Sequence, residues 1–199
     1  MPDWQVVAVR HGETEWSRDG RHTGRTDVAL TDNGRADARC LVNALAGRSF
    51  VRVLTSPLQR ARETCELAGL GDRAEPCPAL MEWDYGDYEG LTTAQIRATR
   101  PDWWLWRDGC PHGEAADDVA RRIDPVVAEL RDAGGDVALF AHGHVLRVLA
   151  ARWAEQPPQL GSRLALSTAA ISLLAFEHER PVLHRWNDVS HLPPGRRPR

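Results

Sequence analysis

The chain has 199 residues, of which 42% are hydrophobic and 27% are charged, values that are ordinary for a globular protein with a sizeable core. Its formal net charge is −3, so the charge indicates neither a nucleic acid nor an anionic membrane surface as a partner. All 25 basic residues are arginine, which excludes a Schiff-base lysine and a P-loop lysine.

The four cysteines and the first residues of the chain predict a compartment. Cys40, Cys65, Cys77 and Cys110 form no CxxC pair and no zinc-ligand spacing. The N-terminus lacks the basic start and apolar stretch of a signal peptide, and no apolar run approaches the ~20 residues of a membrane span. We therefore expect a cytoplasmic protein that does not enter a membrane. The oligomeric state stays open, with a homodimer as one alternative.

The first apolar run ends in a cation, an imidazole and a glycine. Residues 6–9 are rich in β-branched side chains, which predicts a buried strand of a parallel sheet. Ligands of open α/β sheets bind beyond the carboxyl ends of the strands, where Arg10 and His11 follow. The guanidinium group suits phosphate oxygens, and the imidazole can act as a nucleophile. Solvated polar residues at a strand end are the alternative interpretation.

Two helices are predicted on either side of the second strand. Residues 14–25 have loop composition, and Thr31 then caps a helix that ends at Gly47. A strand follows at residues 50–55. Ser56, with Pro57 and Gln59 behind it, predicts a capping box and a helix to about residue 67. Arg60 lies in the first turn of that helix, and the capping register favours it over Arg62 for facing the strand ends.

The middle of the chain predicts a cover over one end of the sheet. Residues 75–78 interrupt regular structure, and residues 79–90 form an acidic, aromatic loop. A short helix is predicted at residues 92–100. Residues about 83–114 are interpreted as a lid or insertion, whose tryptophans are expected to pack locally rather than form a stacking platform.

The last part of the chain predicts a helix, a strand, a second helix and a hairpin. The apolar stripe at residues 119–130 marks a helix that Pro125 should kink or restart. The strand at residues 136–141 ends in His142, Gly143 and His144, and a helix follows. Strands at about 170–176 and 182–187 form a hairpin. The chain is expected to be one domain, residues 1–192, with a disordered tail at 193–199.

Three strand ends and one loop thus carry chemistry that would converge at one edge of the sheet. The strand ends hold Arg10 with His11, Arg60, and His142 with His144, and the loop holds Glu82. Such a set suggests phosphoryl transfer, because cations stabilise the charge on the phosphoryl oxygens. In this interpretation His11 attacks phosphorus, Glu82 exchanges the proton, and no metal or other cofactor is needed. A metal site at the two histidines 142 and 144 is the weaker alternative, because a third ligand at the right spacing is missing.

Four motifs in this order resemble the histidine phosphatase (phosphoglycerate mutase-like) superfamily. They are residues 10–16 (RHGETEW), Ser56-Pro57 with Arg60, Glu82 before Tyr85-Gly86, and Ala141-His142-Gly143. The resemblance covers nearly the whole chain, to about residue 192. It implies a three-layer α/β/α sandwich with a mostly parallel sheet.

The resemblance also implies roles for individual residues. His11 would become a phosphohistidine, Glu82 would be the acid and base, and the phosphate would be held by Arg10, Arg60 and His142. Substrate contacts are expected from a wider set, which comprises Ser17, Thr23, Gly24, Tyr85, Gly143, His144 and Arg147. Competing acids near Glu82 are Glu15, Asp84, Asp87 and Glu89.

The branch of the superfamily decides between hydrolysis and transfer. The runs at residues 82–90 and 106–114 are similar to broad-specificity acid phosphatases and sedoheptulose bisphosphatases. The chain lacks the Glu-Arg-His-Tyr-Gly pattern of the glycolytic mutases, and a mutase must exclude water from its phosphorylated histidine. We therefore expect a metal-independent phosphomonoesterase for sugar phosphates or bisphosphates. A phosphoglycerate mutase and a non-catalytic phospho-ligand binding module are the alternatives.

His144 and Arg147 lie one helical turn apart, away from the apolar stripe of their helix. If that face lines the pocket, the two side chains could bind a distal phosphate or carboxylate. An exposed polar helix face is the equal alternative.

Overall fold

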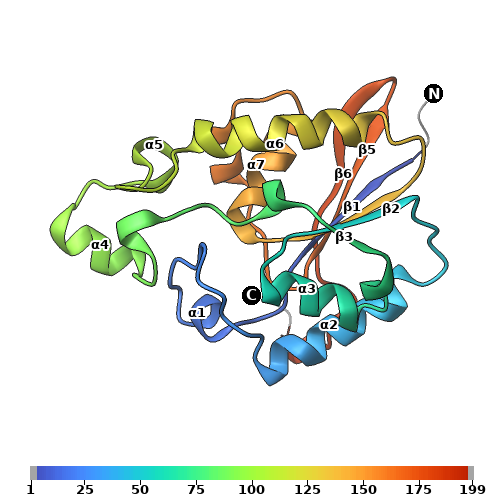
Figure 1. The fold of residues 1–199 in the computed structure, drawn as a ribbon, viewed down its shortest axis with the longest axis horizontal. Helices are drawn as coiled ribbons and strands as arrows, with labels where there is room; N and C mark the ends of the chain where they lie inside the picture. Colours follow the sequence, from blue (N-terminus) through green and yellow to red (C-terminus); the bar gives the residue numbers. More distant parts are fainter. Residues whose placement is uncertain (1–3, 197–199) are drawn as a thin grey trace.

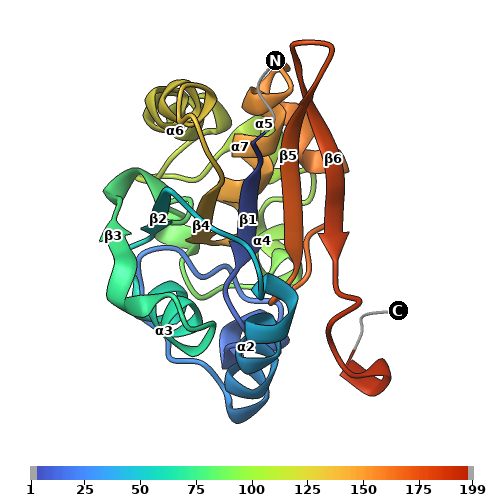
Figure 2. The same ribbon diagram turned by 90° about the vertical axis from the view of Figure 1, so that its right-hand side faces the viewer.

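The computed structural model describes residues 4–196 and shows one six-stranded sheet between two layers of helices (Figures 1 and 2). The strand order is β3-β2-β4-β1-β5-β6. β4 pairs in parallel with β1 and β2, and β2 with β3, whereas β5 pairs antiparallel with β1 and β6. The predicted three-layer sandwich with a mostly parallel sheet is confirmed. The strands are β1 (Val6–Arg10), β2 (Arg52–Thr55), β3 (Ala74–Pro76), β4 (Val137–Ala141), β5 (Ile171–Glu177) and β6 (Arg180–Asp188).

The central strand β1 separates two apolar cores. Successive side chains of a strand point to opposite faces of the sheet. Val7 and Val9 pack in the core beneath α2 (Asp32–Leu45) and α3 (Gln59–Leu67). Val6 and Ala8 pack in the core beneath α6 (Ala116–Arg131) and α7 (Gly143–Trp153). Because both faces of β1 are covered, its sequence is a continuous apolar run without alternation.

The starts of two helices test the predicted caps. Thr31 caps α2 as predicted, because its hydroxyl accepts a hydrogen bond from the Gly34 N–H at 3.0 Å. The predicted Ser56 cap of α3 is wrong, since that helix begins at Gln59 and Leu58 occupies the cap position without a side-chain bond. The Ser56 hydroxyl instead lies 2.7 Å from the ring of His142, a residue far away in the sequence.

Three local features differ from the sequence predictions. Part of the 75–78 segment, expected to be irregular, belongs to β3, which pairs with β2. The loop after β1 contains the short helix α1 (Glu15–Arg18). Its N-cap residue Thr14 forms a capping box with Ser17. Helix α6 runs through Pro125 as one element, so the predicted restart does not occur.

The segment at residues 83–114 lies beyond the carboxyl end of β1 (Figure 1). It contains η3 (Gly86–Tyr88), α4 (Thr93–Thr99) and α5 (Leu105–Asp108). Trp103 and Trp106 are buried there, which fits the expected local packing, but 41% of the Trp104 surface is exposed. The remaining short 3-10 turns are η1 (Gly71–Arg73), η2 (Pro78–Leu80), η4 (Pro158–Arg163) and η5 (Pro194–Arg196).

The C-terminal part forms the predicted hairpin from β5 and β6. Within the predicted tail, η5 is ordered, and Arg196 forms an ion pair with Asp37 at 2.9 Å. Residues 197–199 of that tail lie outside the described part of the chain. Across residues 4–196, no helix combines the length and the apolar character needed to cross a membrane.

Candidate active site

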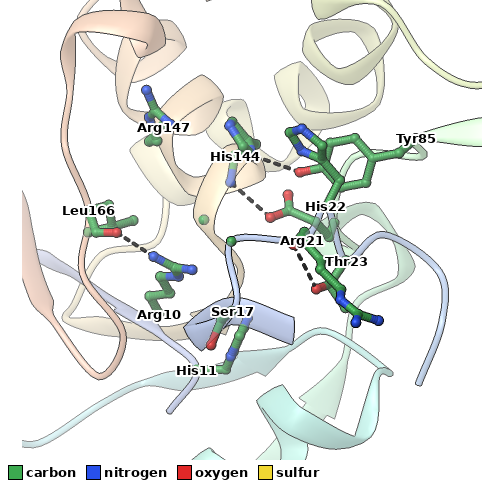
Figure 3. A pocket seen from close by; sticks show the side chains of 13 residues that line it. Arg10, His11, Ser17, Arg21, His22, Thr23, Tyr85, His144, Arg147 and Leu166 are labelled. Carbon is green, nitrogen blue, oxygen red and sulfur yellow. Dashed lines mark hydrogen bonds between the residues drawn. The ribbon is translucent and has the colours of Figure 1, made fainter. Parts of the chain in front are cut away.

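The predicted convergence at one edge of the sheet is present around a cavity of about 180 Å³ (Figure 3). Because β1 and β4 are paired, Arg10 lies beside Ala141, and the His11 N–H donates to the carbonyl of Ala141. The two polar strand ends are thereby side by side. The cavity is lined by Arg10, His11, Ser17, Gly20, Arg21, His22, Thr23, Glu82, Tyr85, Gly143, His144, Arg147 and Leu166.

His11 is fixed in one protonation form by its neighbours. Its Nδ1 lies 2.7 Å from the carbonyl oxygen of Gly12, and since a carbonyl only accepts, Nδ1 must carry the proton. Burial, followed by the charges of Arg60 and Arg10, lowers the pKa of His11 well below its usual 6.5. The ring is therefore neutral near pH 7. Its Nε2 has a lone pair and no hydrogen-bond partner among the described residues.

His142 lies directly behind His11, with ring centroids 5.1 Å apart. Arg60 Nε donates to His142 Nδ1 at 3.0 Å, so Nδ1 is unprotonated and Nε2 carries the proton. That Nε2 donates to the Ser56 hydroxyl at 2.7 Å. Burial and the charge of Arg60 lower the pKa of His142 well below 6.5. Both ring nitrogens are thus occupied, and His142 does not line the cavity.

Arg60 is fully buried and also does not line the cavity. Its two terminal nitrogens donate to backbone carbonyls of the loop after α1, those of Thr23, Gly24 and Thr26, at 2.9–3.2 Å. Although the predicted cap is wrong, Arg60 is the residue of the pair that lies on the inner face of α3, since its rival Arg62 is exposed. Arg60 therefore adds a positive charge beneath His11 and holds the loop that forms one side of the cavity.

Glu82 is buried and is held by backbone N–H groups. Its Oε1 accepts hydrogen bonds from Trp83 at 2.9 Å and Val145 at 2.8 Å, and its Oε2 accepts from His144 at 2.9 Å. Two of these donors belong to the first turn of α7, where the helix dipole favours a carboxylate. Among the described contacts, Oε2 makes one hydrogen bond and so retains acceptor capacity toward the cavity.

The rival acids are engaged elsewhere or exposed. Asp84 pairs with Arg25 at 3.7 Å, and Asp87 with His112 at 3.0 Å. Glu89 accepts from the backbone of the loop beside the cavity, and Glu15 is exposed. Glu82 is thus the acid among these candidates that lines the cavity.

Arg10 has an unsatisfied donor beside the cavity. Its Nη1 donates to the carbonyl of Leu166 at 2.5 Å, whereas its Nε is buried without a hydrogen-bond partner in the described structure. A buried N–H group is normally paired, so this donor is available to an anion bound at the cavity. A Cβ added at Gly143 would lie 3.3 Å from the Arg10 guanidinium carbon, so a side chain there would press on this guanidinium group.

His144 and Arg147 both line the cavity, so the alternative of an exposed polar helix face is wrong. The Tyr85 hydroxyl lies 2.6 Å from His144 Nδ1. Burial and the charge of Arg147 lower the pKa of His144 well below 6.5, so this ring is neutral. Arg147 donates from Nε to the carbonyl of Gly161 at 2.8 Å and lies over the Trp106 ring, 4.8 Å from its centroid.

The predicted loop contacts are only partly present. Ser17 and Thr23 line the cavity, but the Ser17 hydroxyl donates to the Thr14 carbonyl within its own turn. Gly24 does not line the cavity, and its N–H donates to Glu89 at 2.9 Å.

His22 lines the cavity, which the sequence did not predict. Its ring centroid lies 4.8 Å from that of Tyr85 and 6.4 Å from that of His144 (Figure 3). Burial lowers its pKa to about 4. The loop composition alone gave no signal for this placement, because the partners of His22 come from distant parts of the chain.

The residues that the structure describes include no cluster of three or more histidine, cysteine or carboxylate side chains able to hold a metal ion. The acidic and imidazole groups at the cavity instead form hydrogen bonds with backbone groups or with the Tyr85 hydroxyl. Their arrangement suits an anion, which would meet the unpaired donor of Arg10 and the start of α7.

Comparisons with known proteins agree with this geometry. The family model described as histidine phosphatase superfamily (branch 1) matches residues 6–189. An acid phosphatase of Mycobacterium tuberculosis is 45% identical over 179 residues, which cover 87% of each chain. The sedoheptulose 1,7-bisphosphatase of Saccharomyces cerevisiae is 35% identical over 181 residues, 75% of this chain and 67% of the yeast protein. A solved Mycobacterium tuberculosis structure superposes with a TM-score of 0.88 at 42% identity, covering 93% of this chain and 97% of the other.

Proposed function

The chain belongs to the histidine phosphatase superfamily, and we propose on that premise that it hydrolyses phosphate monoesters of small metabolites through a phosphohistidine at His11. Residues 1–192 would act as one domain, in which the segment 83–114 covers the site. The reaction needs no metal or other cofactor, because arginine side chains supply the positive charge.

The protonation form of His11 is the observation that carries this proposal. Nδ1 holds its proton against the Gly12 carbonyl, which leaves the lone pair of Nε2 available. A neutral imidazole is the nucleophilic form, and burial together with two arginine charges keeps it neutral. The same two charges would stabilise the transferred phosphoryl group, so they serve both the nucleophile and its target.

The phosphate would bind where donors are unused. The buried Nε of Arg10 and the first turn of α7 at Gly143 would bind its oxygens. For Arg60 and His142 to contact phosphate, as expected from the resemblance, their mutual hydrogen bond must open. His142 would then donate from Nδ1, and its Nε2 would accept from the Ser56 hydroxyl.

In the reaction, Nε2 of His11 attacks phosphorus in line with the departing oxygen. The N–P bond forms as the P–O bond breaks, and Glu82, protonated at the start of the cycle, gives its proton to the leaving alkoxide. Glu82 then takes one proton from water as the water oxygen attacks the phosphohistidine. The N–P bond breaks, inorganic phosphate leaves with the water oxygen, and Nε2 of His11 and protonated Glu82 are restored.

Sugar phosphates and bisphosphates are the proposed substrates. The yeast relative is named for a sugar bisphosphate, and both curated relatives above are named as phosphatases, which leaves the mutase alternative less supported. Arg147 and His144, which both line the cavity, would bind the distal phosphate or another anionic group. The cytoplasmic location and a homodimer stay predictions.

A phosphate-release assay tests the proposed function. We expect the protein to release phosphate from p-nitrophenyl phosphate and from a panel of sugar phosphates, with and without EDTA. His11→Ala should lower the rate by about 10⁴-fold or more, as loss of a nucleophile does in other enzymes. Transfer of phosphate from a bisphosphate to a glycerate without net release would instead support the mutase.

The role of Glu82 has a separate test. Glu82→Gln should lower kcat for glycerol phosphate by about 10²–10⁴-fold, the contribution of a general acid. p-Nitrophenyl phosphate should lose much less, because p-nitrophenolate leaves without a proton. Equal losses for both esters would show that the substitution acts through the structure of the α7 start and not through proton transfer.

A further inference from the structure

Two side chains outside the cavity contact the backbone on both sides of Glu82. Arg122 lies in α6, Glu114 is the last residue of the segment 83–114, and neither of them lines the cavity. We propose that the ion pair between Arg122 and Glu114 positions the carboxyl group of Glu82 for proton transfer to the leaving oxygen. This inference rests on the proposed function, because Glu82 is the acid of that reaction.

Arg122 binds the chain at Glu82 and shortly before it. Its Nη1 donates to the carbonyl of Ala79, and its Nη2 donates to the carbonyl of Glu82 at 3.1 Å. Toward Glu114, its Nε lies 2.6 Å from Oε1 and its Nη2 lies 3.0 Å from Oε2. A planar guanidinium group that meets a carboxylate through two hydrogen bonds has a fixed orientation. Arg122 therefore ties the main chain of Glu82 to α6.

Glu114 binds the residues that follow Glu82. Its Oε2 accepts a hydrogen bond from the Asp84 N–H at 2.8 Å. Its main chain adds two more bonds, because the Glu114 N–H donates to the carbonyl of Asp84 and the Glu114 carbonyl accepts from the indole N–H of Trp83, each at 2.8 Å. The carboxylate of Glu114 thus bonds both to Arg122 and to the backbone two residues after Glu82.

Water has little access to this ion pair, since the side chains of Arg122 and Glu114 are 19% and 16% exposed. A second ion pair beside Glu82, between Arg25 and Asp84, is longer at 3.7 Å, and its side chains are 38% and 37% exposed. Shielded charges are screened less by salt than exposed charges. The Arg122–Glu114 pair therefore fixes the segment around Glu82 more firmly than the Arg25–Asp84 pair does.

The carboxyl group of Glu82 depends on this support, because its hydrogen-bond donors lie on two separate segments. The Trp83 N–H belongs to its own loop, whereas the N–H groups of His144 and Val145 belong to α7. A shift of the loop relative to α7 would break some of these bonds and turn Oε2 away from the leaving oxygen. Misplacing a catalytic group by about 1 Å can lower a rate about 10²-fold. Loss of Arg122 should therefore impair proton transfer more than phosphate binding.

The test compares glycerol phosphate, whose leaving group needs a proton, with p-nitrophenyl phosphate, whose leaving group does not. Arg122→Met removes the charge and the donors and keeps an unbranched side chain. We expect it to lower kcat/KM for glycerol phosphate about 10- to 100-fold and kcat/KM for p-nitrophenyl phosphate less than threefold. Added to Glu82→Gln, the same substitution should lower kcat/KM for glycerol phosphate by less than a further threefold, because the acid is already absent.

Two further variants complete the experiment. Arg152→Met is the matched control, because Arg152 forms a similar pair with Asp124 of α6, with bonds of 2.7 and 3.1 Å, and does not line the cavity. It should leave the ratio of the two kcat/KM values within twofold. Glu114→Gln keeps the shape of Glu114 and removes its charge, and it should lower the ratio at least threefold. It decides the matter if Arg122→Met does not fold.

The outcomes separate this inference from the proposed function. If Glu82→Gln lowers the ratio but Arg122→Met and Glu114→Gln leave it unchanged, the positioning role is overturned and Glu82 remains the acid. A full further loss when Arg122→Met is added to Glu82→Gln would also overturn it, because Arg122 would then act independently of Glu82. A ratio that Glu82→Gln itself leaves unchanged would overturn the proposed role of Glu82, and this inference with it.

Discussion

At the scale of single residues, the neutral imidazole of His11 links burial to reactivity. The ring is 4% exposed and faces two guanidinium groups, so its charged form is unfavourable. The Gly12 carbonyl then decides which nitrogen holds the proton. A nucleophile in this environment needs no neighbouring base to remove a proton before it attacks.

The pH dependence of turnover follows from this state of His11. The unprotonated ring is the reactive form, and its pKa is lowered well below 6.5, so protonation removes activity only at acid pH. We expect kcat/KM, which reports the free protein, to persist as the pH falls below about 6, the range where an ordinary histidine becomes charged. The measurement is a kcat/KM profile for two esters whose phosphate pKa values differ. A loss of kcat/KM near pH 6.5 with both esters would contradict this assignment.

At the scale of elements, the turn after β1 and the start of α2 are held together by two glycines. A Cβ added at Gly12 would lie 2.5 Å from the carbonyl oxygen of Gly34, and one added at Gly34 would lie 2.2 Å from the carbonyl oxygen of Glu13. The backbones approach too closely for any side chain. This contact sets the position of the turn that carries His11.

The effect of a side chain at this contact can be measured. Gly34→Ala should lower the free energy of unfolding by about 1–3 kcal/mol, the usual cost of overpacking, although alanine favours a helix more than glycine does. Asn33→Ala, at the exposed neighbouring position, is the control and should change it by less than about 0.5 kcal/mol. Denaturant unfolding of both variants measures these changes in the free energy of unfolding. A stabilised Gly34→Ala variant would show that helix propensity outweighs the contact.

The elements also show what the sequence could and could not predict. Strand β1, the Thr31 cap and the C-terminal hairpin were predictable, because they depend on local periodicity and capping. The Ser56 cap failed because the same hydroxyl has a partner in His142, 86 residues away. The short strand β3 depends on pairing with β2, which a three-residue segment does not encode locally.

The candidate site, too, could be predicted only where local sequence determines a residue's position. Arg10, His11, Glu82 and Gly143 could be placed, because each follows a strand or lies in a motif of fixed order. Whether a side chain faces the cavity was not encoded locally, since it depends on contacts between distant segments. Arg60 and His142 lie behind the cavity for this reason, and His22 enters it.

At the scale of the whole molecule, folding buries several histidines in neutral form. The pKa values of His11, His22, His142 and His144 are all lowered, with burial as the largest cause. The unfolded chain binds protons at these sites near pH 6.5, and the folded chain does so only at lower pH. Their contribution to stability is therefore fully present above about pH 6.5 and is lost as the pH falls toward the folded pKa values.

His22 allows this dependence of stability on pH to be measured, because its pKa in the folded protein is about 4. Between pH 7 and pH 5, its protonation in the unfolded chain should lower the free energy of unfolding by up to about 2 kcal/mol. His22→Phe lacks the titrating group and should show a decrease that is smaller by about this amount. Guanidinium unfolding at both pH values provides the comparison. Equal decreases in the two proteins would contradict a neutral, buried His22.

The covalent intermediate is the most direct test of the account as a whole. The protein is mixed with a ³²P-labelled ester, quenched with alkali within milliseconds, and separated from free phosphate. We expect protein-bound label that survives alkali and is lost in acid, as an N–P bond requires, located at His11 and absent from His11→Ala. Turnover without any labelled protein, or label that persists in His11→Ala, would contradict it.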